Sequence, residues 1–144
     1  MPSPALHTLV KLRRAAREET QAALARAEAE LLAQTARHQA VLDATTAGRA
    51  ALDPTDPNSL SVWAAFRMRQ EVAERREAAK RMQKERDVTQ KRALHVARVR
   101  EELALEKLIE RQAADEDADL LRRESRRMDE IAGRPGSSPV HLDR

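Results

Sequence analysis

The side chains best suited to bind a transition metal are the four histidines, because the chain contains no cysteine. His7, His38, His95 and His141 are scattered along the sequence. No two of them stand three or four residues apart, the spacing that places two ligands on one face of a helix. They are better explained as seam or surface residues of helices, and the sequence predicts neither a metal site nor a cofactor.

Catalytic motifs are not found in the sequence. It has no glycine-rich phosphate loop, no H-E-x-x-H motif and no recognisable pair of nucleophile and base. The helical composition described below also predicts no concave pocket that would exclude water, which catalysis normally needs. We therefore expect that the protein is not an enzyme.

Charged residues occur in blocks. Residues 75–100 hold ten bases against three acids, residues 101–119 hold eight acids against two bases, and four arginines then follow at Arg122, Arg123, Arg126 and Arg127. The first block could bind nucleic acid, but it lacks the interleaved aromatic side chains on which bases stack. A solvated helix face is the favoured interpretation, and a basic helical nucleic-acid binder is kept as an alternative.

Trp63 and Phe66 are the only aromatic residues, and they stand three positions apart. They could close the end of a helical hairpin by packing against Val41, Leu42 and Leu52. They could also form a binding hot spot, since aromatic side chains dominate interface energetics. Both interpretations stay open, with Phe66 expected to point further outward than Trp63.

The aromatic pair and the charged blocks all lie on one long stretch, from Ser59 to about Gly133. It has no proline or glycine before Gly133 and consists mainly of strong helix formers. As one helix it would span roughly 110 Å at 1.5 Å per residue. A first helix is predicted over about residues 4–50, with Ser3 as its N-cap and Pro4 in its first turn. Its seven-residue rows of apolar or small residues form an imperfect heptad seam, which Arg13, Arg17 and Gln34 interrupt.

A short breaker joins the two helices. Residues 53–58 contain two prolines with Asp and Asn, which stop a helix and favour turns. Asn58 or Ser59 is expected to cap the second helix. The predicted fold is all-α: one antiparallel coiled-coil hairpin with a longer second helix, over residues 1–133. In the expected register residue i faces 111 − i, so that the first helix ends near residue 107 and Glu28 and Glu30 lie opposite residues 81–84. Residues 134–144 are expected to form a disordered tail.

The amino-acid composition limits further which classes of fold and partner are possible for this protein. Aromatic residues are 1% and charged residues 35% of the chain, which suits a narrow helical seam but not a thick core. The formal net charge of +3 does not by itself indicate a nucleic-acid partner. No apolar run is long enough for a membrane span and none resembles a signal peptide. We expect a cytoplasmic protein without direct membrane insertion.

The C-terminal part contains Leu108-Ile109-Glu110-Arg111-Gln112 and closes with Arg126-Arg127-Met128-Asp129-Glu130-Ile131-Ala132. These two stretches resemble the end of the flagellar export protein FliJ. That family has a similar leucine–acid–Arg-Gln step, then a basic stretch and a Met-Asp-Glu close at the same separation. The aromatic pair after the loop, the chain length and the hairpin layout are also similar. The chain differs in its shorter loop and in Ala44 and Gly48, where better-known members have aromatics.

The resemblance implies a function. Proteins of this family are stalks in the central pore of the hexameric export ATPase, which they activate, and their loop side reaches the cytoplasmic domain of the export gate. They are also linked to recycling of export chaperones. The implied location is the cytoplasmic side of the inner membrane, at the export apparatus. An injectisome stalk protein and a generic coiled-coil scaffold or adaptor are the alternatives.

Two sets of candidate site residues follow from this resemblance and from the residue pattern. The tip set, expected to bind the export gate, contains Val41, Leu42, Trp63, Phe66, Gln70 and Ala73. The ring set, expected to face the ATPase, contains Leu6, Leu9, Leu108, Arg111, Gln112, Leu120, Leu121, Arg126, Arg127, Met128, Asp129, Glu130 and Ile131. Most of the ring set lies on helix that the hairpin leaves unpaired, so it could fray in solution and become ordered on binding.

Overall fold

The structure is a computed structural model that describes residues 3–134. It contains two helices, α1 (Pro4–Ala50) and α2 (Pro57–Ala132), and the described residues include no strand. The predicted all-α hairpin with a longer second helix is confirmed. Of the tail predicted over residues 134–144, all but Arg134 lies outside the described residues.

Both helices begin at a side-chain cap followed by proline. Ser3 caps α1 as predicted, because its Oγ accepts a hydrogen bond from the backbone N–H of Leu6 at 3.3 Å. Asp56 caps α2, accepting from the N–H of Asn58 at 3.0 Å. The predicted caps, Asn58 and Ser59, are therefore inside the helix. Pro57, in the first turn of α2, has no N–H that needs a hydrogen-bond partner.

The connection between the helices is organised by Asp53. Its carboxylate accepts from the N–H of Thr55 at 2.9 Å and from the Thr55 hydroxyl at 2.6 Å. These bonds hold the pKa of Asp53 below its ordinary value of 3.8. The Asp53 N–H donates to the Ser59 hydroxyl at 3.0 Å, which ties the connection to the first turn of α2.

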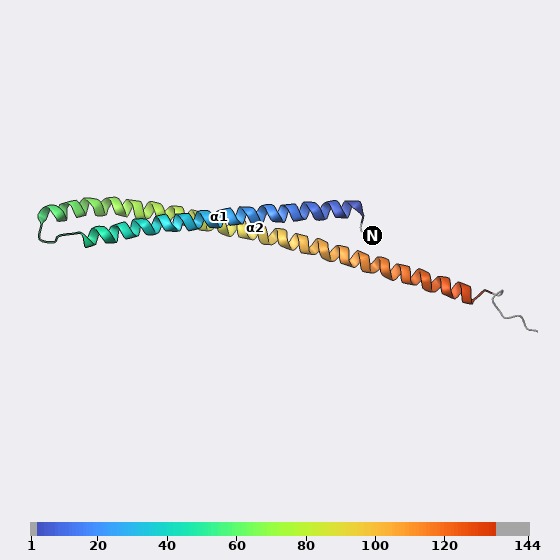
Figure 1. The fold of residues 1–144 in the computed structure, drawn as a ribbon. Helices are drawn as coiled ribbons and strands as arrows, with labels where there is room; N and C mark the ends of the chain where they lie inside the picture. Colours follow the sequence, from blue (N-terminus) through green and yellow to red (C-terminus); the bar gives the residue numbers. More distant parts are fainter. Residues whose placement is uncertain (1–2, 135–144) are drawn as a thin grey trace, which may run out of the picture. The chain divides into compact units, whose positions relative to one another are not determined.

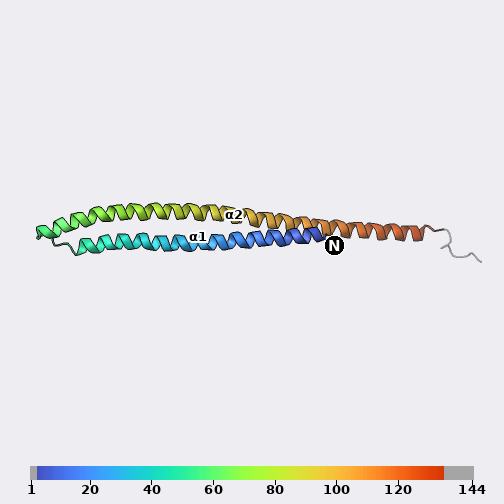
Figure 2. The ribbon, with the colours of Figure 1, turned by 90° about the horizontal axis from the view of Figure 1, so that it is seen from above.

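By packing, the chain divides into two compact units. One is residues 15–99, and the other combines residues up to Arg14 with those from Arg100 onward. In the first unit α1 and α2 run side by side in opposite directions from the connection (Figures 1 and 2). The contact between them is narrow, since among described residues of this unit only Ala27 and Val88 are buried apolar side chains.

Polar side chains fill much of the seam in this unit. Thr20, Gln34 and Thr45 are buried, and Gln34 is only 1% exposed. Its side-chain amide donates to the backbone carbonyl of Glu77 at 3.3 Å and to the Glu77 carboxylate. Gln34, expected from the sequence to interrupt the heptad rows, is thus the most buried link between the two helices. A buried amide of this kind requires its partners, because an unsatisfied one would cost about 1–3 kcal/mol.

The predicted register holds near the connection and shifts further along. Gln34 contacts Glu77, and Gln70 donates to the Val41 carbonyl at 3.3 Å, both as residue i facing 111 − i requires. Thr20 should then face Lys91, but its hydroxyl contacts Nδ1 of His95 at 3.2 Å, four residues further.

The shift has a source in α2. Along α2, the residues that face α1 follow one another at spacings that alternate between three and four. The alternation breaks once, where a spacing of four from Ala73 to Glu77 is followed by another from Glu77 to Arg81. An insertion of four residues into a heptad pattern locally changes the winding of a coiled coil. The extra turn of α2 accounts for the four-residue shift in the pairing of Thr20 with His95.

Ion pairs flank the same seam. Lys84 pairs with Glu30 at 2.8 Å, as expected, whereas Glu28 pairs with Arg92 at 3.6 Å and not with residues 81–84. The Lys84 ammonium holds the pKa of Glu30 below its ordinary value of 4.5. Exposed pairs of this kind contribute little to stability, so they orient the helices more than they stabilise them.

In the second unit the first turns of α1 pack beside α2 from Arg100 to Ile109. Arg13 pairs with Glu101 at 2.6 Å, and Leu105 is buried. Every residue from Glu110 to Arg134 is exposed, so α2 continues there with its side chains in solvent. We call residues 110–132 the exposed segment. No helix among residues 3–134 is long and apolar enough to cross a membrane.

Candidate partner-binding surfaces

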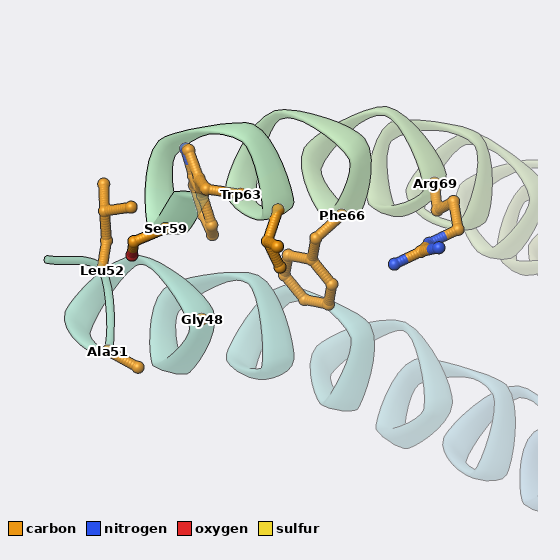
Figure 3. Close-up of a pocket in the computed structure, with 8 residues that line it drawn as sticks. Gly48, Ala51, Leu52, Ser59, Trp63, Phe66 and Arg69 are labelled. Atoms are coloured by element: carbon orange, nitrogen blue, oxygen red, sulfur yellow. The ribbon is translucent and has the colours of Figure 1, made fainter. Parts of the chain in front are cut away.

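An apolar cavity opens where the two helices meet the connection (Figure 3). It has a volume of about 240 Å³ and is lined by Gly48, Ala51, Leu52, Ser59, Val62, Trp63, Phe66 and Arg69. The two aromatic rings are 5.7 Å apart between centroids, at an angle of 37°. Tilted pairs at this distance are favourable beyond the area they bury.

Gly48 makes the close approach of the rings possible. A Cβ added at Gly48 would lie 2.6 Å from Cε1 of Phe66 and 3.1 Å from Cζ3 of Trp63. Any side chain there would push the rings off α1. The two rings are both half-buried and both lie against α1 at Gly48, and the expectation that Phe66 points further outward than Trp63 stays a prediction.

The remainder of the tip set is divided between the seam and the surface. Gln70 bonds the Val41 carbonyl and lies 3.3 Å from the Thr45 hydroxyl, and Ala73 is half-buried. Leu42 is exposed. Neither Val41 nor Leu42 lines the cavity with the rings, whereas Leu52 does. The structure thus brings Trp63 and Phe66 together with Leu52 and Gly48, and leaves Leu42 as an outward side chain beyond them.

The ring set lies entirely in the second unit. Leu6 is half-buried and lines a shallow hollow with Gln112, so the structure brings these two predicted residues together. Leu9 and Leu108 are both exposed and do not line this hollow. The other members are all on the exposed segment: Arg111, Leu120, Leu121, Arg126, Arg127, Met128, Asp129, Glu130 and Ile131.

Large apolar side chains on the exposed segment are left uncovered by the rest of the described residues. Leu121 is 66% and Met128 70% exposed, and Leu120 and Ile131 are also more than half exposed. An ion pair between Arg122 and Asp119, at 2.8 Å, lies within the helix itself. A helix that carries such side chains with nothing to cover them is typical of a partner surface.

Sequence reasoning missed the network around Gln34. Arg37 donates to Oε1 of Gln34 at 3.4 Å, and the Gln34 amide donates to Glu77. This hydrogen bond, with smaller contributions from Lys80 and Arg37, holds the pKa of Glu77 below its ordinary value of 4.5. The signal was present, because Gln34 occupies a seam position between Leu31 and His38.

The histidines do not converge. His95 contacts Thr20 in the seam, His38 is half-buried and His7 is exposed, while His141 lies outside the described residues. Within residues 3–134 no group of three or more His, Asp or Glu side chains is arranged to hold a metal ion. The basic block is partly neutralised by Glu28 and Glu30 across the seam.

The geometry therefore offers two separate surfaces, the aromatic cavity in one unit and the exposed segment in the other. Comparison of the chain with protein-family models, with curated proteins and with solved structures finds no significant match.

Proposed function

We propose that this protein is the central stalk and activator of a hexameric type III protein-export ATPase, in the flagellar system. The observation that carries the proposal is the exposed segment, a helix with uncovered Leu120, Leu121, Met128 and Ile131. The closing Met128-Asp129-Glu130-Ile131-Ala132 sequence, which resembles the FliJ family, lies on the same segment.

A pore lined by charged subunits fits such a helix. Acids occupy the exposed segment up to Asp119, and arginines at positions 122, 123, 126 and 127 follow. Bands of opposite charge favour one orientation and one depth of insertion, and affect specificity more than affinity. The apolar side chains would supply the affinity as they lose water on binding.

The tip set is proposed to contact the cytoplasmic domain of the export gate. The support is an apolar cavity of about 240 Å³ lined by Trp63 and Leu52, together with the exposed Leu42, which does not line the cavity. Since Gln70 and Val41 are engaged with each other, their share in binding would be to hold the rings in place. Recycling of export chaperones is part of the same proposal.

The test is a pull-down with the export ATPase followed by an assay of ATP hydrolysis. We expect the full chain to bind and stimulate the enzyme, and a chain ending at Asp119 to lose stimulation. A point variant, Leu121→Asp, should lose most of it as well. Leu32→Asp is the matched control, because Leu32 is 73% exposed but lies on α1 in the other unit.

Full stimulation by the chain ending at Asp119 would show that the part of the exposed segment after Asp119 does not face the ring. Absence of any binding to the ATPase would leave a coiled-coil scaffold or adaptor. For the tip, Leu42→Asp should weaken binding to the export-gate domain while circular dichroism stays helical. An unchanged affinity would remove Leu42 from the gate surface.

A further inference from the structure

The outward face of α2 carries a second apolar stripe, besides the seam. Its members follow heptad spacing and are all exposed: Ala65, Met68, Val72, Ala79 and Met82. Met68 is 71%, Val72 56% and Met82 54% exposed. Residues that repeat in this way on one side of a helix form the seam of a coiled coil when a second helix packs on them. We call these five residues the outer stripe.

The outer stripe is bordered by bases without partners. Arg75 occupies the heptad position between Val72 and Ala79, Arg76 lies at the edge of the stripe, and Arg86 continues the row four residues after Met82. None of these three arginines has a carboxylate or hydrogen-bond partner within residues 3–134, unlike Arg67, which pairs with Glu71 at 3.5 Å. A helix that packs on the stripe would therefore bind best if it carried carboxylates along its edges.

The chain itself contains a helix of that kind. The first half of the exposed segment, from Glu110 to Leu121, holds five acids against Arg111 alone. Ala114, Ala118 and Leu121 follow each other at spacings of four and three, and all are exposed. Small residues allow two helices to approach closely, and the flexible methionines of the outer stripe can adapt to them.

We propose that the outer stripe binds the acidic half of the exposed segment from a second copy of this chain. Both segments belong to α2, so the contact joins two copies. Packing of two outer stripes on each other is disfavoured, since it would bring Arg75 and Arg76 of both copies together. A membrane surface is also disfavoured, because the stripe is one row wide and has no aromatic or leucine side chain for the interface.

The consequence is that self-association covers Leu121 and the acids around it. A copy whose exposed segment is held in this way cannot offer that segment to another partner at the same time. Self-association of this kind does not depend on the ATPase proposal, because it concerns the purified chain alone.

Sedimentation velocity of the full-length chain over a range of concentrations is the primary experiment. We expect a concentration-dependent increase in mass at low ionic strength. Raising the salt from about 50 mM to about 500 mM should weaken the association at least about tenfold, because exposed charges are screened. The paired reversals Arg75→Glu with Arg76→Glu, and Asp115→Lys with Asp117→Lys, should each give a monomer.

A mixture of the two reversed proteins provides the decisive measurement. Each retains one natural surface and carries one reversed surface, so the equimolar mixture should associate again while each protein alone does not. Arg26→Glu with Arg49→Glu is the matched control, since it changes the net charge equally but on α1, and it should associate as the natural chain does. Circular dichroism should show the same helix content for all of them.

Three results would overturn the proposal. One is a natural chain that stays monomeric at all concentrations and ionic strengths. Another is association that survives either paired reversal, or that the mixture does not restore. The third is a monomeric chain that binds vesicles of anionic phospholipid through Arg75 and Arg76, which would assign the outer stripe to a membrane surface.

Discussion

Gly48 determines how the aromatic pair sits on α1. Its missing side chain leaves the space that Cε1 of Phe66 occupies, 2.6 Å from where a Cβ would be. In most helices a change from glycine to alanine stabilises by about 1 kcal/mol. Here that gain opposes the cost of overpacking, which is typically about 1–3 kcal/mol.

We therefore expect Gly48→Ala to destabilise the hairpin by about 1 kcal/mol in the natural background. In a Phe66→Ala background the ring is gone, and the same change should stabilise it. Thermal melts followed by circular dichroism measure both values, and emission from Trp63, the only tryptophan, reports whether its ring becomes wetter. The same sign in both backgrounds would mean that the close approach to Phe66 is not what limits position 48.

Glu77 provides a pH-dependent link at the same scale. Its pKa lies below the ordinary value of 4.5 because Gln34 donates to its carboxylate in the folded chain. A carboxyl group whose pKa is lowered by folding stabilises the fold fully above its unfolded pKa. That contribution is lost as the pH falls through the folded value.

The hairpin should therefore lose stability as the pH falls below about 4.5, and Glu77→Gln should lose less over this window than the natural chain. Melting temperatures at several pH values between about 6 and 3 test this. Glu85→Gln is the control, because the Glu85 carboxylate pairs with Arg81 on the surface of α2, at 3.2 Å, and not with α1. Parallel profiles for Glu77→Gln and the natural chain would argue against the Gln34 bond as the source.

At the scale of the element, the sequence predicted the helices well and the register only in part. Helix formers without interruption, Ser3-Pro4 at the start and the two prolines of the connection are local signals, and each acts through its own few residues. Register depends on the two helices together. A constant register set at the connection predicts the pairing of Gln34 with Glu77, but it does not allow for the extra turn of α2 after Ala73.

The hydrogen bonds across the seam were harder to predict, because they too depend on how the two helices are aligned. Apolar rows suggested which side of α1 faces inward, and that side is correct. The sequence placed Gln34 at a seam position, but it could not indicate that Glu77, 43 positions away, would be its partner, or that a ring would lie against Gly48. The site predictions inherit this limit: Phe66 and Gln70 were expected at a binding surface, and both engage α1.

Paired cysteines can test the register, because the chain has no cysteine of its own. We expect Gln34→Cys with Glu77→Cys, and Thr20→Cys with His95→Cys, to form disulfides under mild oxidation, since these side chains meet across the seam. Thr20→Cys with Val88→Cys is the control. Val88 is also buried in the seam but lies seven residues before His95, about 10 Å along the helix. Rapid cross-linking of the control pair would contradict the pairing of Thr20 with His95.

At the scale of the whole molecule, the two units differ in what stabilises them. Residues 15–99 are stabilised by contacts between α1 and α2, whereas every side chain of the exposed segment faces solvent. A helix without a packed face gains little from tertiary contacts. Removing the end of the exposed segment should therefore have almost no effect on the stability of the remaining chain, which makes its leucines available for binding without a cost to the fold.

Two truncations separate these contributions. A chain ending at Asp119 should melt within about 2 °C of the full chain, because the described residues that it lacks are all exposed. A chain ending at Val99 also loses buried Leu105 and the ion pair between Arg13 and Glu101. Burial of one leucine contributes about 1.5–3 kcal/mol, so the melting temperature of this shorter chain should fall by about 10 °C.

Equal melting temperatures for the two truncations would mean that the first turns of α1 add nothing by packing on α2. A large loss already at Asp119 would mean that the exposed segment is held by contacts with the hairpin.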